Sequence, residues 1–76
     1  MVDTLSQIKS KNRRAGQFFF ERGSPPVVSK QGNYLITRGY GGGFVLYKYS
    51  PKTGKISYDQ SSSSKANLIA IAKRKA

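Results

Sequence analysis

The sequence predicts a single small α+β domain, with a short N-terminal helix, a three- to four-stranded antiparallel sheet and a C-terminal helix packed on one face of that sheet. Two segments rich in aromatic and β-branched residues, 33–38 and 44–50, are separated by a run of glycines, which is typical of a hairpin. The turn sequence SPKTG follows them, and an amphipathic run of good helix formers occupies 65–75. At 76 residues, the chain can bury one core and has no room for a second domain.

The first predicted element is a short basic helix over residues 1–14. Asp3 or Thr4 is the expected N-cap. Leu5 and Ile8 share one face of this helix, and lysines and arginines occupy its last turn, where the helix dipole favours cations. Because so few large apolar residues serve this helix, we expect it to dock weakly on the sheet.

An antiparallel sheet is predicted over residues 17–60. Its first segment, 17–21, contains three consecutive phenylalanines between glycines, which favours a strand. Three successive rings cannot face one side of a strand, so either both faces are covered or one ring is left for a partner. Prolines then break regular structure, and the stretch up to residue 31 is predicted to be a loop with an extended piece at 27–28.

Two hairpins form the centre of the predicted sheet. The first joins 33–38 to 44–50 through a flexible five-residue tip at 39–43. The second runs through the turn at 50–54 into a strand at 55–59. The proline of this turn suits the second position of a type I turn and its glycine suits the left-handed position that follows, so we expect a bulged hairpin.

Alternation along these strands separates their residues into two faces. One face carries Tyr34, Ile36, Arg38, Phe44, Leu46, Lys48, Ile56 and Tyr58. The other face carries Leu35, Thr37, Val45, Tyr47, Tyr49, Lys55, Ser57 and Asp59. The first face is the more apolar, so we expect the C-terminal helix to cover it.

A serine linker at 61–64 is predicted to end by capping the C-terminal helix. That helix is expected over 65–75, because the segment consists of good helix formers and has cations in its last turn. The apolar stripe of this helix consists of Leu68, Ile69, Ile71 and Ala72.

The composition argues against catalysis. The chain has no cysteine and no histidine, which removes thiol nucleophiles, disulfides and the usual general base and metal ligands. Its acids, Asp3, Glu21 and Asp59, lie on different predicted elements, so we expect neither an acid–base pair nor a carboxylate metal site. The sequence therefore predicts no enzymatic activity, no catalytic residue, no metal site and no cofactor.

Hydropathy and size predict the setting of the protein. No apolar stretch approaches the roughly 20 residues that span a bilayer, so we expect no membrane association. The absence of cysteine favours a location in the cytoplasm. A core this small is marginally stable on its own, which leaves a homodimer open.

Lysines and arginines number 14 against three acids, a formal net charge of +11. They gather near the two helix ends and the second hairpin, and nucleic acid, an anionic nucleotide or an acidic protein surface would suit such clusters. The glycine tip lacks the Lys followed by Ser or Thr of a phosphate-binding loop. The expected phosphate contacts are Arg13, Arg14, Arg38, Lys48, Lys52, Lys55, Lys73, Arg74 and Lys75.

Tyrosines interleave with these cations, which is typical of proteins that bind single-stranded nucleic acid by stacking rings on bases. The expected base contacts are Tyr40, Tyr47 and Tyr49. For Tyr47 and Tyr49 a second interpretation, packing under the N-terminal helix, stays open.

Several segments resemble a family of small uncharacterised bacteriophage proteins. The likeness rests on AGQFFF at 15–20, GNYLITR at 32–38, YKYSPKTGKI at 47–56 and the basic C-terminal helix. It implies a phage origin and a setting in the cytoplasm of the host cell, and it supplies no activity or binding residues.

The leading hypothesis is a non-catalytic phage accessory protein that binds DNA or RNA through phosphate contacts and tyrosine stacking. Two alternatives stay open. One is an inhibitor of a host defence or of a host nucleoprotein complex, as an anti-CRISPR protein is. The other is a sponge for anionic nucleotides.

Overall fold

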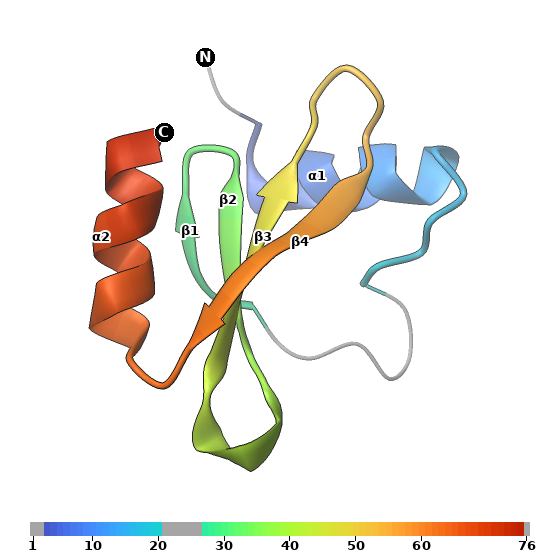
Figure 1. The fold of residues 1–76 in the computed structure, drawn as a ribbon. Helices are drawn as coiled ribbons and strands as arrows, with labels where there is room; N and C mark the ends of the chain where they lie inside the picture. The colour runs from blue at the N-terminus through green and yellow to red at the C-terminus, as the bar shows by residue number, and fades with distance from the viewer. Residues whose placement is uncertain (1–2, 21–26, 76) are drawn as a thin grey trace.

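A computed structural model of the chain describes residues 3–20 and 27–75, except for the side chain of Tyr40. Its elements follow in the order α1 (Leu5–Arg14), β1 (Val27–Gln31), β2 (Tyr34–Arg38), β3 (Phe44–Tyr49), β4 (Ile56–Ser62) and α2 (Lys65–Lys75), with the 3-10 turn η1 (Tyr40–Gly42) in the glycine tip. The predicted α+β fold is confirmed, and α2 spans the residues predicted for the C-terminal helix (Figure 1).

These strands form one antiparallel sheet in the order β1-β2-β3-β4. Gly32 has φ +58° in the two-residue turn between β1 and β2, the left-handed value that such a hairpin turn favours. In the turn between β3 and β4, Gly54 has φ +76° and its N–H donates to the carbonyl of Ser50 over 2.7 Å. The left-handed glycine predicted for this turn is therefore present.

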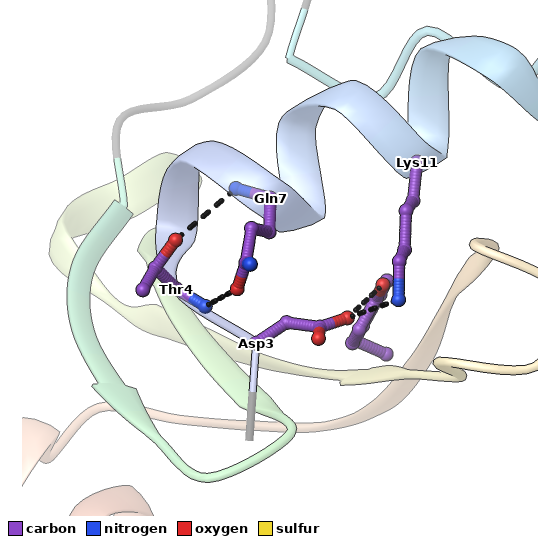
Figure 2. A network of polar contacts seen from close by, with 5 residues as sticks. Asp3, Thr4, Gln7 and Lys11 are labelled. Atoms are coloured by element: carbon purple, nitrogen blue, oxygen red, sulfur yellow. Dashed lines mark hydrogen bonds and ion pairs between the residues drawn. The ribbon is translucent and has the colours of Figure 1, made fainter. Parts of the chain in front are cut away.

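The helix α1 begins with a side-chain cap at Thr4. The Thr4 Oγ1 accepts from the N–H of Gln7 over 3.3 Å, and the N–H of Thr4 donates to Gln7 Oε1 over 2.8 Å (Figure 2). This reciprocal capping box satisfies the backbone N–H groups of Thr4 and Gln7, which explains why the helix starts where it does.

The helix α2 covers one face of the sheet with aliphatic side chains. The buried members of this core are Ile36, Leu46, Leu68 and Ala72. Tyr34 and Phe44, of the same alternation phase, pack at its border. Alternation therefore assigns this face correctly along β2 and β3.

The helix α1 covers the opposite face, so the sheet lies between the two helices (Figure 1). The buried members of this second core are Ile8, Leu35, Tyr49 and Ile56. Leu35 and Ile36 are neighbours in β2 and belong to different cores, because successive side chains of a strand point to opposite faces.

The face predicted for the last strand is wrong. Ile56 lies opposite Tyr49 in the β3–β4 ladder, and Tyr58 lies opposite Tyr47. Because directly opposed residues share a face, Ile56 and Tyr58 lie on the α1 side. The hairpin turn sets this register, and the register shifts again at the bulge between Leu46 and Tyr47.

The strand predicted over 17–21 is also wrong within the described residues, because 17–18 are irregular, 19–20 form a turn and Phe18 has φ +57°. The side chain of Gln17 bonds the edge of β4 instead: its Nε2 donates to Ile56 O, and the Ile56 N–H donates to its Oε1, each over 2.6 Å. The first strand is β1, which contains the extended piece predicted at 27–28 and continues to Gln31 through residues predicted as a loop. Glu21 and the prolines lie outside the described residues.

The serine segment is only partly a linker. Ser61 and Ser62 extend β4, where they pair with β3. Ser64 caps α2 as predicted, since its Oγ accepts from the N–H of Asn67 over 3.2 Å.

Candidate nucleic-acid interface

Basic residues far apart in the chain lie at one end of the molecule. The β3–β4 turn and the C-terminus of α2 are at the same end (Figure 1). Lys52 and Lys55 are exposed in that turn, and Lys48 is exposed on β3 just before it. The exposed cations of the last turn of α2 are Lys73, Arg74 and Lys75. The basic cluster of the second predicted hairpin and that of the C-terminal helix, which are separate in the sequence, are thus neighbours in the structure.

A surface hollow of about 480 Å³, which we call the hairpin hollow, lies where these clusters meet. Lys48 and Lys52 line it from β3 and the turn, and Lys75 lines it from α2. Asn33 and Tyr34 line it from the β1–β2 hairpin. Among its lining residues in the described part of the chain there is no acidic side chain, so the hollow suits an anion.

On the α1 side of the same turn lies a second hollow of about 290 Å³, the helix hollow. Lys11 and Arg14 of α1 line it together with Lys52. Lys52 therefore borders both hollows and connects the cations of the two helices. We call Lys11, Arg14, Lys48, Lys52 and Lys75 the basic end.

Polar contacts hold α1 against this turn, in addition to the few apolar side chains from which weak docking was expected. Asn12 is 1% exposed, and its Nδ2 donates to Gly54 O over 2.9 Å and to Gln17 Oε1 over 2.6 Å. Its Oδ1 accepts from the N–H of Phe19 over 2.7 Å. This network joins α1, the segment after it and the β3–β4 turn.

The contact between α1 and the turn also needs a glycine. A Cβ on Gly54 would lie 2.6 Å from the carbonyl oxygen of Lys11, a distance that real Cβ atoms essentially never show. Because Gly54 also has a positive φ, it is required there for two independent reasons. This close approach is what brings Lys11 and Arg14 beside Lys52.

The acid Asp3 neutralises part of this surface. Its Oδ2 accepts from Lys11 Nζ over 3.0 Å (Figure 2) and from the hydroxyl of Tyr49 over 2.7 Å. The hydrogen bond from Tyr49, followed by that from Lys11, lowers the pKa of Asp3 below its usual 3.8. Burial, followed by the hydrogen bond to Asp3, raises the pKa of Tyr49 to about 12.

Asp59 neutralises a second cation, because its Oδ2 lies 3.0 Å from Lys75 Nζ. Both side chains of this pair are partly exposed, and such pairs contribute little to stability. Within the described residues, Asp3 and Asp59 are the acidic side chains and each is engaged by a lysine. The basic end therefore keeps a surplus of positive charge.

The glycine tip lies at the opposite end of the molecule (Figure 1). Arg38 is exposed at the end of β2, next to this tip, and so does not join the basic end. Tyr40 belongs to η1, and its side chain lies outside the described part of the structure. Arg13 lines a third hollow, of about 180 Å³, with Lys9 and Phe18.

Two tyrosines predicted to contact bases belong to the α1 core. Tyr49 is 1% exposed, so its assignment as a stacking residue is wrong and the alternative, packing under α1, holds. Tyr47 is half-buried, with its ring edge-on to Phe19 at 4.8 Å and to Tyr58 at 6.3 Å between centroids. Face alternation alone left this choice open, because it does not say where α1 lies.

Two other tyrosines are better placed than the predicted ones. Tyr58 is 62% exposed on the edge strand β4. Tyr34 lines the hairpin hollow and lies opposite Lys48 in the β2–β3 ladder. Tyr34 could have been identified from the sequence, because the predicted hairpin of 33–38 with 44–50 places this tyrosine across from Lys48.

No protein-family model, no curated protein and no solved structure matches the chain. The resemblance to phage proteins therefore stays a prediction. Within residues 3–20 and 27–75, no three acidic, histidine or cysteine side chains group as metal ligands would. No described helix combines the length and the apolar character needed to cross a membrane.

Proposed function

We propose that the protein is a non-catalytic nucleic-acid-binding protein whose basic end contacts the phosphate backbone. One observation carries the proposal: Lys52 lies between two hollows that also collect Lys11 and Arg14 from α1 and Lys75 from α2. A phage origin and a cytoplasmic setting rest on the sequence resemblance and belong to the same proposal.

The electrostatics of a polyanion explain why convergence matters. Charges spread evenly over a surface act separately once they are farther apart than the roughly 8 to 10 Å screening length at physiological salt. Cations that line one hollow can act on the same ligand, and a nucleic acid presents a closely spaced row of phosphate charges. The net charge of +11 adds a long-range attraction that accelerates encounter.

Salt dependence tests the proposal. Lys11 and Lys75 already pair with acids. If Arg14, Lys48 and Lys52 each neutralise one phosphate, the logarithm of the affinity should fall against the logarithm of salt with a slope of about −2.7 for duplex DNA and about −2.1 for a single strand. Fluorescence anisotropy with a labelled oligonucleotide between 50 and about 300 mM salt measures that slope. Absence of binding at the lowest salt, or a flat response, would overturn the proposal.

A pair of charge reversals tests the location. Lys52→Glu should weaken binding about tenfold or more and make the slope shallower by about one, because it removes one phosphate contact and adds repulsion. Arg38→Glu makes the same change in net charge at the glycine tip and should weaken binding much less. Equal losses in the two variants would place the interface elsewhere.

A further inference from the structure

We infer that the hairpin hollow is a subsite for one nucleotide unit, with the base on the ring of Tyr34 and the phosphate among Lys48, Lys52 and Lys75. This inference rests on the proposed function and deepens it, because it assigns a ligand class to one part of the basic end. It also gives Tyr34 a part in binding that its place in the sequence does not show.

The ring of Tyr34 is held in place on one side and open on the other. Tyr34 is half-buried and packs at the border of the α2 core, the cluster that contains Ile36 and Leu46. The same residue lines the hairpin hollow. A ring that is already fixed loses little conformational freedom when a base stacks on it, which favours stacking.

The cations that line the hollow with Tyr34 come from three separate elements. Lys48 is the cross-strand partner of Tyr34, Lys52 comes from the β3–β4 turn and Lys75 comes from the last turn of α2. The ion pair of Lys75 with Asp59 is partly exposed, with 43% of the lysine side chain accessible, so Lys75 can turn to a phosphate at little cost. The phosphate of a nucleotide whose base stacks on Tyr34 would thus find several ammonium groups in the same hollow.

A residue that lines the hollow, Asn33, carries a buried acceptor without a partner. The Oδ1 atom of Asn33 is buried and makes no hydrogen bond with any described residue, although Asn33 lines the hollow. Burying an acceptor without a hydrogen bond is unfavourable, so such atoms mark places where a ligand or water donates. A base supplies N–H donors on its pairing edge, which is free only when the base is unpaired.

The size of the hollow fits a single unit. Its volume of about 480 Å³ lies within the range of roughly 300 to 1,000 Å³ that small-molecule sites occupy. A base can reach Tyr34 only when it leaves its stack, so we expect a preference for single strands over duplexes of the same sequence. The unit could belong to a strand or to a free nucleotide, and the two sources share this chemistry.

The test compares a single strand with its abasic counterpart, which keeps every phosphate and lacks one base. The normal strand carries 2-aminopurine at that position, whose fluorescence falls when it stacks. Tyr34→Leu removes the ring and keeps apolar bulk for the α2 core, and Tyr34→Phe keeps the ring. Tyr58→Leu is the matched control, because it removes an exposed tyrosine that lies on the α1 side, outside the hairpin hollow.

Tyr34→Leu should weaken binding of the normal strand about tenfold to a hundredfold, abolish the fluorescence change and leave the abasic strand unaffected. Tyr34→Phe and Tyr58→Leu should bind like the wild type, and circular dichroism confirms that each variant is folded. Asn33→Ala should weaken binding of the normal strand alone. A fluorescence change that persists in Tyr34→Leu, or equal losses on both strands, would overturn the subsite.

The outcomes separate the two proposals. If the normal and the abasic strand bind with the same salt-dependent affinity, the nucleotide subsite is overturned and phosphate binding at the basic end is left intact. Failure of every strand to bind at 50 mM salt overturns both. Calorimetry with a nucleoside monophosphate identifies the source: binding as tight as that of the strand indicates a free nucleotide, and much weaker binding indicates a strand.

Discussion

The two faces of the sheet are held by different kinds of contact. On the α2 face, the buried side chains are aliphatic, and the helix docks by closing an apolar stripe over the sheet. On the α1 face, the apolar core is joined by a network in which Asn12 and Gln17 bond to backbone groups of the β3–β4 hairpin. Apolar burial is non-directional, whereas hydrogen bonds and a glycine contact specify one position.

This difference bears on function. The basic end depends on where α1 sits, because Lys11 and Arg14 reach the turn only through the contact with Gly54. Both faces bury an apolar core, and the α1 face adds polar contacts that fix the position of α1. Substitutions on the two faces should therefore differ in size and in kind.

The largest expected effect is on the apolar face. Leu68→Ala should lower the free energy of unfolding by about 3 kcal/mol, because it removes a fully buried side chain and leaves a cavity under α2. Urea denaturation followed by circular dichroism measures this loss. The same change at Leu5, a half-buried position of α1, should cost about 1 kcal/mol because less of the side chain is buried, and an equal cost would show that Leu68 is not the better-buried residue.

The next effect is on the polar face. Asn12→Ala should cost about 2 kcal/mol, because it leaves the Gly54 carbonyl and the Phe19 N–H without their partner. Chemical denaturation measures the cost. Asn67→Ala, at an exposed position in α2, is the control and should change stability by less than about 0.5 kcal/mol. A cost for Asn12→Ala no greater than that of the control would mean that the network does not hold α1.

Tyr49→Phe tests the bond between the α1 core and Asp3. At neutral pH the variant should lose about 1 kcal/mol, the usual value of such a hydrogen bond. Since the pKa of Tyr49 is raised from 10.0 to about 12, folding favours its protonated form. The stability that this group contributes is complete below pH 10 and is lost as pH rises toward 12.

The difference in stability between wild type and Tyr49→Phe should therefore shrink between pH 10 and 12, which denaturation at several pH values measures. At acidic pH the dependence runs the other way, because stability falls as the pH is lowered. The lowered pKa of Asp3 stabilises the fold above pH 3.8, and that contribution disappears as pH falls through the folded-state value. A pH-independent difference over both limbs would exclude the Tyr49–Asp3 bond.

The smallest expected effect is at the exposed pair between the sheet and α2. Asp59→Asn should change stability by less than about 0.5 kcal/mol, because both partners are partly exposed. If Lys75 contacts phosphate, the same variant should bind nucleic acid at least as tightly as the wild type, since the lysine is released. Thermal unfolding and anisotropy measure the two quantities, and weaker binding would exclude a contact from Lys75.

Local sequence patterns predicted most elements and missed those that depend on distant partners. The C-terminal helix, the Thr4 cap and the left-handed glycine of the second turn follow from neighbouring residues. The three phenylalanines have strand propensity but form no strand. Phe19 packs in the α1 core, and the preceding Gln17 makes side-chain hydrogen bonds to the backbone of β4. The face of β4 depends on the register of a ladder, which propensity does not encode.

The sequence by itself determined the fold class, the charge of +11, the absence of histidine and cysteine and the positions of the basic clusters along the chain. The tertiary structure decided that Tyr49 is buried and that Lys11, Lys52 and Lys75 share one end. Charge and local propensity belong to residues and their near neighbours. The convergence depends on contacts such as that of Asn12 with Gly54, between residues 42 positions apart, which exist only once the sheet and both helices have assembled.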